Sequence, residues 1–122
     1  MNRLTKAEEE VMQMIWEWGP CTVSQLISKM EQPHPPHSTI SSIVRILEKK
    51  DFIDHKTYGR TYEYFAVIAK EAYSKFSLKN LVAGYFGGSM NNLVSFLVKE
   101  DDLSLSELTE ALKKIESNNH KE

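Results

Sequence analysis

The sequence is poor in cysteine and contains no long apolar run. Cys21 is the single cysteine, which excludes a disulfide within the chain and a cysteine-rich zinc or copper site. Cysteine this scarce is typical of the reducing cytoplasm. The unbroken apolar runs are only a few residues long, whereas a membrane-spanning helix needs about 20. The first residues turn acidic before any apolar stretch begins, so the sequence does not predict a signal peptide.

Signatures of catalysis are also missing. Gly87-Gly88 stands alone and follows no predicted strand, so it does not predict a phosphate-binding loop, and no Gly-x-Ser-x-Gly occurs. Cys21 has no neighbouring sign of an activated thiol. His34 and His37 are too few ligands for a metal site. We therefore expect no enzymatic activity, no cofactor and no bound metal.

The composition is that of an ordinary globular protein. The chain has 122 residues, of which 41% are hydrophobic and 26% charged, with a net charge of -2. Residues 34–60 differ, because this segment contains five basic and three acidic side chains and therefore has a net charge of +2. This segment predicts one local basic face on an otherwise neutral or acidic molecule.

Capping boxes and apolar periodicity predict three helices in the first half. Thr5 and Glu8 can cap a helix over 6–18, and Thr22 and Gln25 can cap a short second one after a stub of strand at Cys21. Ser38 is the expected N-cap of the third. The apolar stripes follow an i, i+3, i+4, i+7 spacing in the first and third helices, at Val11, Met14, Ile15 and Trp18, and at Ile40, Ile43, Val44 and Leu47.

Two β-rich runs follow the third helix. Residues 52–56 and 61–65 flank Thr57-Tyr58-Gly59-Arg60, which predicts a hairpin with Tyr62 and Tyr64 in or near the core. Three helices followed by a hairpin are the winged helix-turn-helix arrangement. The predicted fold class is therefore mainly α with a small β-hairpin wing.

Residues 68–122 form a second, helical region. Gly87-Gly88 interrupts an apolar helical pattern, Ser89 can cap the next helix, and Ser104 with Glu107 can cap a last one. So few residues bury little apolar surface alone, so we expect a winged-helix DNA-binding domain over 1–67 and a helical domain over 68–122 that pairs two chains. Folding back on the first domain is the alternative. The expected dimerisation residues are Leu93, Val94, Leu97, Leu105, Leu108 and Leu112.

The polar side of the third helix is the expected DNA contact. Short hydroxyl side chains let a helix lie close in the major groove, and an arginine can bind guanine with two hydrogen bonds. At the hairpin tip, arginine and tyrosine can lie against the sugar-phosphate backbone. The expected DNA-binding residues are His37, Ser38, Thr39, Ser41, Ser42, Arg45, Lys49, Tyr58 and Arg60.

The chain resembles the penicillinase repressor family (BlaI, MecI and CopY) over nearly its whole length. The resemblance rests on motifs in the same order in both: Leu4-Thr5-x-Ala7-Glu8, Gly19-Pro20-x-Thr22-Val23, Ser38-Thr39-Ile40, Gly59-Arg60-x-Tyr62-x-Tyr64 and Phe86-Gly87-Gly88-Ser89. It implies a cytoplasmic homodimeric repressor that binds a palindromic double-stranded DNA operator. In the β-lactamase branch, a membrane-bound sensor-protease causes derepression by cleavage in the C-terminal domain.

Three departures from the family pattern bear on its implications. The scissile Asn-Phe pair of the β-lactamase branch aligns here with Phe96-Leu97, which is therefore the candidate cleavage site in this chain. Positions that are often lysine in the third helix are Ser38 and Ser41, which implies a different operator. The cysteine-rich tail of the copper-responsive members is absent.

Two other functions fit the sequence. A ligand-responsive winged-helix regulator could hold a small molecule among Tyr73, Phe76, Tyr85 and Phe86. A protein-interaction adaptor could keep the fold without contacting DNA, and the low positive charge fits that function.

Overall fold

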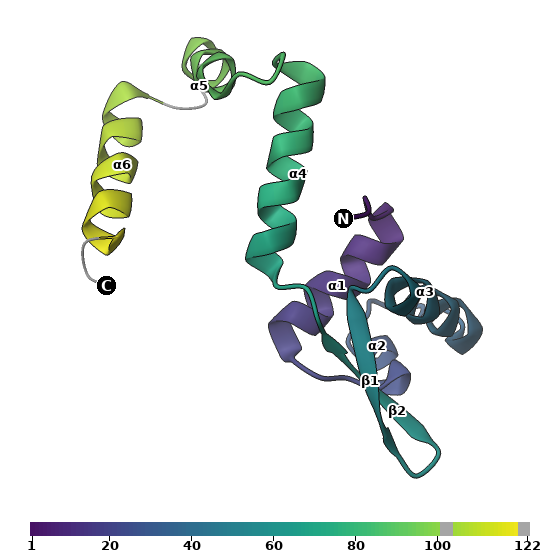
Figure 1. Cartoon of the computed structure of the whole chain (residues 1–122). Helices are drawn as coiled ribbons and strands as arrows, with labels where there is room; N and C mark the ends of the chain where they lie inside the picture. The colour runs from purple at the N-terminus through teal and green to yellow at the C-terminus, as the bar shows by residue number, and fades with distance from the viewer. Residues whose placement is uncertain (101–103, 120–122) are drawn as a thin grey trace. The chain divides into compact units, whose positions relative to one another are not determined.

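The computed structural model describes residues 1–100 and 104–119. The elements follow the order α1 (Lys6–Trp18), α2 (Val23–Ser28), α3 (His37–Lys49), β1 (Ile53–Tyr58), β2 (Thr61–Ala66), α4 (Lys70–Tyr85), α5 (Met90–Lys99) and α6 (Leu105–Asn119) (Figure 1). This order confirms the predicted mainly helical fold with a small hairpin. The chain divides into two compact units, Met1–Ser77 and Leu78–Glu122, which are described separately.

Both predicted capping boxes of the first unit are present. The Thr5 hydroxyl accepts a hydrogen bond from the Glu8 N–H, and the Glu8 carboxylate accepts one from the Thr5 N–H at 2.8 Å. Thr22 and Gln25 form the same pair at the start of α2. Capping fixes where each helix begins, because it satisfies N–H groups that have no partner within the helix.

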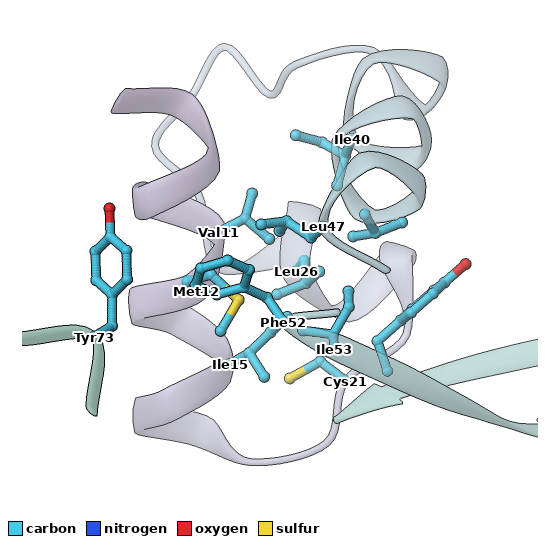
Figure 2. Close-up of a cluster of buried hydrophobic side chains, with 12 residues drawn as sticks. Val11, Met12, Ile15, Cys21, Leu26, Ile40, Leu47, Phe52, Ile53 and Tyr73 are labelled. Carbon is cyan, nitrogen blue, oxygen red and sulfur yellow. The ribbon is translucent and has the colours of Figure 1, made fainter. Parts of the chain in front are cut away.

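One buried cluster joins the three helices to the hairpin (Figure 2). The apolar stripe of α3 is buried as predicted at Ile40, Val44 and Leu47. The predicted apolar stripe of α1 is partly wrong, because Trp18 is 58% exposed whereas Met12, which was not predicted, is fully buried. Helix α1 contacts both α3 and β2, so it buries two adjacent rows, while Trp18 ends the helix beyond the core and lies beside Lys29.

The hairpin is anchored to the core at its base. Strands β1 and β2 pair antiparallel from Ile53–Ala66 to Tyr58–Thr61, and Gly59 turns the chain with a φ of 62°, the conformation that a type II′ turn needs at its first central position. Cys21 forms an isolated bridge to Tyr64 with backbone hydrogen bonds of 2.9 and 2.8 Å, which confirms the predicted stub of strand. The Cys21 side chain is buried, and burial raises the pKa of its thiol.

The first turns of α4 belong to the first unit. Tyr73 is buried against Phe52 and Trp16, and its hydroxyl accepts a hydrogen bond from the Leu4 N–H and donates one to the Glu9 carboxylate. Phe76 packs against the same cluster. Because these aromatic side chains complete the core, the compact unit extends to Ser77 and does not stop at the end of the hairpin.

A buried ion pair joins the start of α1 to the end of α3. The Lys50 ammonium lies 2.7 Å and 3.1 Å from the two carboxylate oxygens of Glu8, whose side chain is only 6% exposed. Burial alone would raise the pKa of Glu8, but the hydrogen bonds from Lys50 and from the Thr5 N–H outweigh it and hold the pKa below its ordinary value. The folded state therefore favours the charged carboxylate.

We expect Glu8→Gln to lower the free energy of unfolding by about 1–3 kcal/mol at neutral pH, because the charge-assisted hydrogen bonds to Lys50 are lost. The folded pKa lies below the unfolded one, so the wild-type advantage is complete above about pH 4.3 and disappears as the pH falls through the folded value. Urea unfolding at several pH values measures this. Glu10→Gln, at an exposed site of the same helix, is the control, and equal loss in both variants would contradict the prediction.

The second unit leaves much of its apolar surface open. Among residues 78–100 and 104–115, only Val82 is a buried hydrophobic residue. Ser89 caps α5 through the Asn92 N–H as predicted, and Ser104 accepts a hydrogen bond from the Glu107 N–H. In the described part of the chain no single helix is long and apolar enough to span a membrane. Helices α4 and α5, counted together as a bent pair, would meet the requirements of length and composition.

Candidate nucleic-acid interface

Helix α3 presents a polar outer face opposite its buried stripe. At 100° per residue, the side chains pointing away from the core are Ser38, Ser42, Arg45 and Lys49, and all of them are exposed. Thr39 and the 44% exposed Ile46 flank this outer face on one side, and His37, Ser41 and Glu48 flank it on the other. The sequence pattern predicted the hydroxyl and basic residues but did not single out Ile46.

Helix α3 begins two residues earlier than predicted. Pro36, not Ser38, is the N-cap, and no side chain caps the helix. Proline fixes φ near the helical value but has no side-chain acceptor, so the first-turn N–H groups have no side-chain partner. His37 lies in this first turn, where its Nδ1 atom is 3.2 Å from the Ser41 hydroxyl. N–H groups of this kind, at the positive end of the helix dipole, favour an anion such as phosphate.

A polar cleft of about 340 Å³ lies between α3, the start of α2 and the hairpin. It brings together four of the predicted DNA-binding residues, namely His37, Ser41, Arg45 and Arg60. The remaining lining residues were not predicted for the site, and they are Thr22, Val23, Ser24, Thr61, Tyr62 and Tyr64. The capping box at Thr22 was the available signal for the first three, because it marks the start of a helix, although only tertiary packing brings this start beside α3.

The two tyrosines of the hairpin have different environments. Tyr64 is buried as predicted, whereas Tyr62 is 48% exposed, so its predicted place in or near the core is wrong. The Cys21 bridge covers Tyr64, while Tyr62 is two residues closer to the tip. Burial and the Glu48 carboxylate raise the pKa of Tyr64, although Arg45 lowers it, so the hydroxyl stays protonated at neutral pH.

The other predicted DNA-binding residues lie outside the cleft. Ser38, Thr39, Ser42 and Lys49 are exposed on α3, and Tyr58 is 59% exposed near the hairpin turn. Lys56 lies 5.8 Å from the centre of the Phe65 ring, so its ammonium already has an aromatic partner within the hairpin. The arrangement gives a helix face that can enter a groove and a wing that can follow the backbone.

One group of potential metal ligands is present in the part of the chain that the structure describes. The ligating atoms of Glu48, Asp54 and His55 lie within 4.8 Å of one another, at the junction of α3 and β1. The His55 Nδ1 atom is already paired with the Glu48 carboxylate. This arrangement is therefore first a side-chain contact that joins two elements.

The six predicted dimerisation residues lie on α5 and α6. Leu105 is 69% and Leu112 51% exposed, and Leu93, Val94, Leu97 and Leu108 are half-buried. Phe96 and Leu97, the candidate cleavage pair, lie inside α5, so a cut there requires this helix to open locally first. Tyr73 and Phe76 pack in the core of the first unit whereas Tyr85 is 79% exposed, so burial differs sharply among the residues considered for a small ligand.

Comparisons with known proteins place the chain in a family. The sequence model described as penicillinase repressor matches residues 4–117. The chain is 29% identical over 108 residues to the methicillin resistance regulatory protein MecI of Staphylococcus aureus (strain N315), covering 88% of both chains. It is 23% identical over 120 residues to the penicillinase repressor of Bacillus licheniformis, covering 98% of this chain and 94% of that protein. The crystal structure of transcriptional regulator PA4135 aligns with a TM-score of 0.44 and 12% identity over 96% of this chain and 78% of that one.

Proposed function

Since this chain belongs to the penicillinase repressor family, a family of transcriptional repressors, we propose that it represses transcription as a homodimer bound to a palindromic DNA operator. One observation carries the proposal: the outer face of α3 combines small hydroxyl side chains with Arg45, beside a wing that carries Arg60. Small side chains allow close approach to base edges, and the two arginines supply positive charge. The cytoplasm is the expected compartment.

The two-fold symmetry of the operator follows from pairing of two chains. Each α3 and wing would bind one half-site, and the half-sites would lie a whole number of helical turns apart, about 34 Å for each turn. Exposed leucines on α6 support an interface between copies, because they have the heptad spacing of a helix-pairing face. Linking two weak half-site contacts raises the effective concentration of the second, so the dimer binds far more tightly than either unit alone.

Derepression would then act on the C-terminal unit. A membrane sensor-protease that cuts at Phe96-Leu97 would remove α6 and the leucines on it, and pairing would be lost. Another signal that opens α5 would weaken pairing without cutting the chain. Loss of pairing releases the operator because each half-site contact alone is weak. The presence of a cleaved fragment in cells after induction would identify proteolysis as the signal.

We expect two arginine variants to separate base reading from backbone contact. Arg45→Ala would weaken binding to a duplex selected from a random pool by about 1–3 kcal/mol and relax preference at one base pair. Arg60→Ala would weaken binding to all duplexes alike and reduce the slope of affinity against salt by about one unit. Fluorescence anisotropy titrations at several salt concentrations measure both.

The control for both variants is Lys6→Ala, which removes one exposed positive charge from the start of α1. It should leave base preference unchanged. Unchanged binding in both arginine variants would contradict the assignment of α3 and the wing to DNA. An absence of selective binding by the wild-type protein would favour the adaptor function instead.

A further inference from the structure

His55 connects the hairpin to the end of α3. Its Nδ1 atom pairs with the carboxylate of Glu48, which lies in the last turn of α3. On its other side the imidazole stacks on Tyr62, with ring centres 4.2 Å apart and an interplanar angle of 19°. Three side chains from α3, β1 and β2 therefore form one continuous chain of contacts.

Strand register places this chain of contacts on the face of the hairpin that lines the cleft. His55 is directly opposite Tyr64 and Thr57 is opposite Tyr62, and residues opposite each other in an antiparallel pair share a face. Tyr62 and Tyr64 both line the cleft, together with Arg45 and Arg60. The contact of Tyr62 with His55 thus lies two residues along the strand from the wing arginine.

The tip of the hairpin has little else to hold it. Ile53 and Tyr64 are buried at the base of the hairpin, but residues 56–62 are all exposed. A two-stranded hairpin is only marginally stable without packing on another element. The direction of the tip relative to α3 consequently depends on contacts outside the core, and among these Glu48 and His55 join the two elements directly.

We propose that the Glu48–His55–Tyr62 chain is a positioning element that fixes the wing arginine, Arg60, relative to Arg45 on α3 and thereby gives the protein its selectivity for operator over other DNA. The proposal rests on the proposed function, since selectivity has meaning only for a DNA-binding protein. None of the three residues needs to touch a base. Phosphate contacts set register and orientation, so a misplaced wing moves α3 in the groove.

The first test compares affinity for a selected operator with affinity for an unrelated duplex of equal length. Glu48→Ala should reduce this ratio roughly tenfold, as expected for loss of one coupled contact. His55→Phe keeps an aromatic ring against Tyr62 but cannot pair with Glu48, so it should lower the ratio to the same extent. The double variant should have a ratio no lower than that of either single variant. Glu48→Gln retains a hydrogen-bond acceptor and should recover most of the ratio.

Glu63→Ala is the matched control. It removes one carboxylate from the same hairpin, but in the strand register Glu63 is opposite Lys56, on the face away from the cleft. The change in net charge is the same as in Glu48→Ala, so a general gain in DNA affinity is cancelled in the comparison. Equal selectivity in Glu48→Ala and Glu63→Ala would overturn the proposal.

Amide hydrogen exchange provides a second test without DNA. In Glu48→Ala the amides of residues 57–62 should exchange faster, while those of α1 and all amides in Glu63→Ala should keep their wild-type rates. Unchanged exchange at the tip would overturn the proposal. If the wild-type protein selects no duplex, the proposed function fails, and this exchange experiment alone decides about the positioning element.

The same measurements with added Zn²⁺ and with EDTA identify a different means of holding the wing. Glu48, Asp54 and His55 offer an imidazole and two carboxylates, which are suitable ligands for a divalent cation. Selectivity and slow exchange that persist in EDTA support the direct contact. Selectivity that requires Zn²⁺ and disappears in EDTA would overturn it.

Discussion

Placing charge on the exposed leucines of α6 is expected to separate the two chains and to abolish high-affinity operator binding. In the double variant Leu105→Glu and Leu112→Glu, a charged group replaces an apolar one at two positions on the same face of the helix. Both leucines are exposed in the single chain, so their replacement costs little in the fold of one copy. Without pairing, the second half-site loses its effective concentration, and operator affinity should fall by roughly 10²–10⁴.

Sedimentation at micromolar concentration and anisotropy titration of a two-half-site duplex measure these effects. The control is Ser106→Glu with Lys113→Glu, which adds more negative charge at the same spacing but on another side of α6. The control should remain dimeric and keep most of its affinity. A dimeric leucine variant, or equal loss in the control, would exclude this face of α6 as the pairing surface.

Truncating Phe52 is expected to be the most destabilising single change in the first unit. Its side chain is fully buried, and its ring meets Tyr73 edge to face with ring centres 5.5 Å apart. Its backbone also links α3 to the segment that follows β2, since its N–H donates to Leu47 O and its carbonyl accepts from the N–H groups of Val67 and Ile68. Phe52→Ala keeps these backbone bonds but leaves a cavity, so we expect a loss of about 3–5 kcal/mol.

Urea unfolding followed by circular dichroism measures this loss. Tyr58→Ala is the aromatic control, because Tyr58 is 59% exposed near the tip of the wing and its removal should change stability by no more than about 0.5 kcal/mol. Similar losses in the two variants would contradict the central position of Phe52. A stable Phe52→Ala protein would mean that the surrounding side chains close the cavity.

Local signals in the sequence were sufficient for most of the fold. The capping boxes at Thr5 and Thr22 and the stop at Gly19 depend on neighbouring residues, so both ends of α1 and the start of α2 could be predicted without tertiary information. The sequence predicts a boundary after residue 67, whereas the first compact unit extends to Ser77 because Tyr73 and Phe76 pack in its core. Periodicity could not predict that Met12 is buried, because its burial depends on α1 being covered by both α3 and β2.

The candidate site was predictable only in part. Hydroxyl and basic residues on the polar side of α3 followed from periodicity, and Arg60 followed from the turn. The side of α3 that meets the wing depends on the tertiary placement of the hairpin, so the roles of Glu48, His55 and Tyr62 were not predicted. The pair of Glu8 and Lys50, separated by 42 positions, has no local signature for the same reason.

The burial of Cys21 has a consequence for the proposed dimer. The thiol lies in the core and donates to the carbonyl of Gly19, and its raised pKa leaves little thiolate to react with an oxidant. A covalent crosslink between two copies would require the folded first unit to open. In the proposed dimer, association through the C-terminal leucines would therefore be reversible on dilution and insensitive to mild oxidation, and protein concentration would set the fraction of tightly binding dimer.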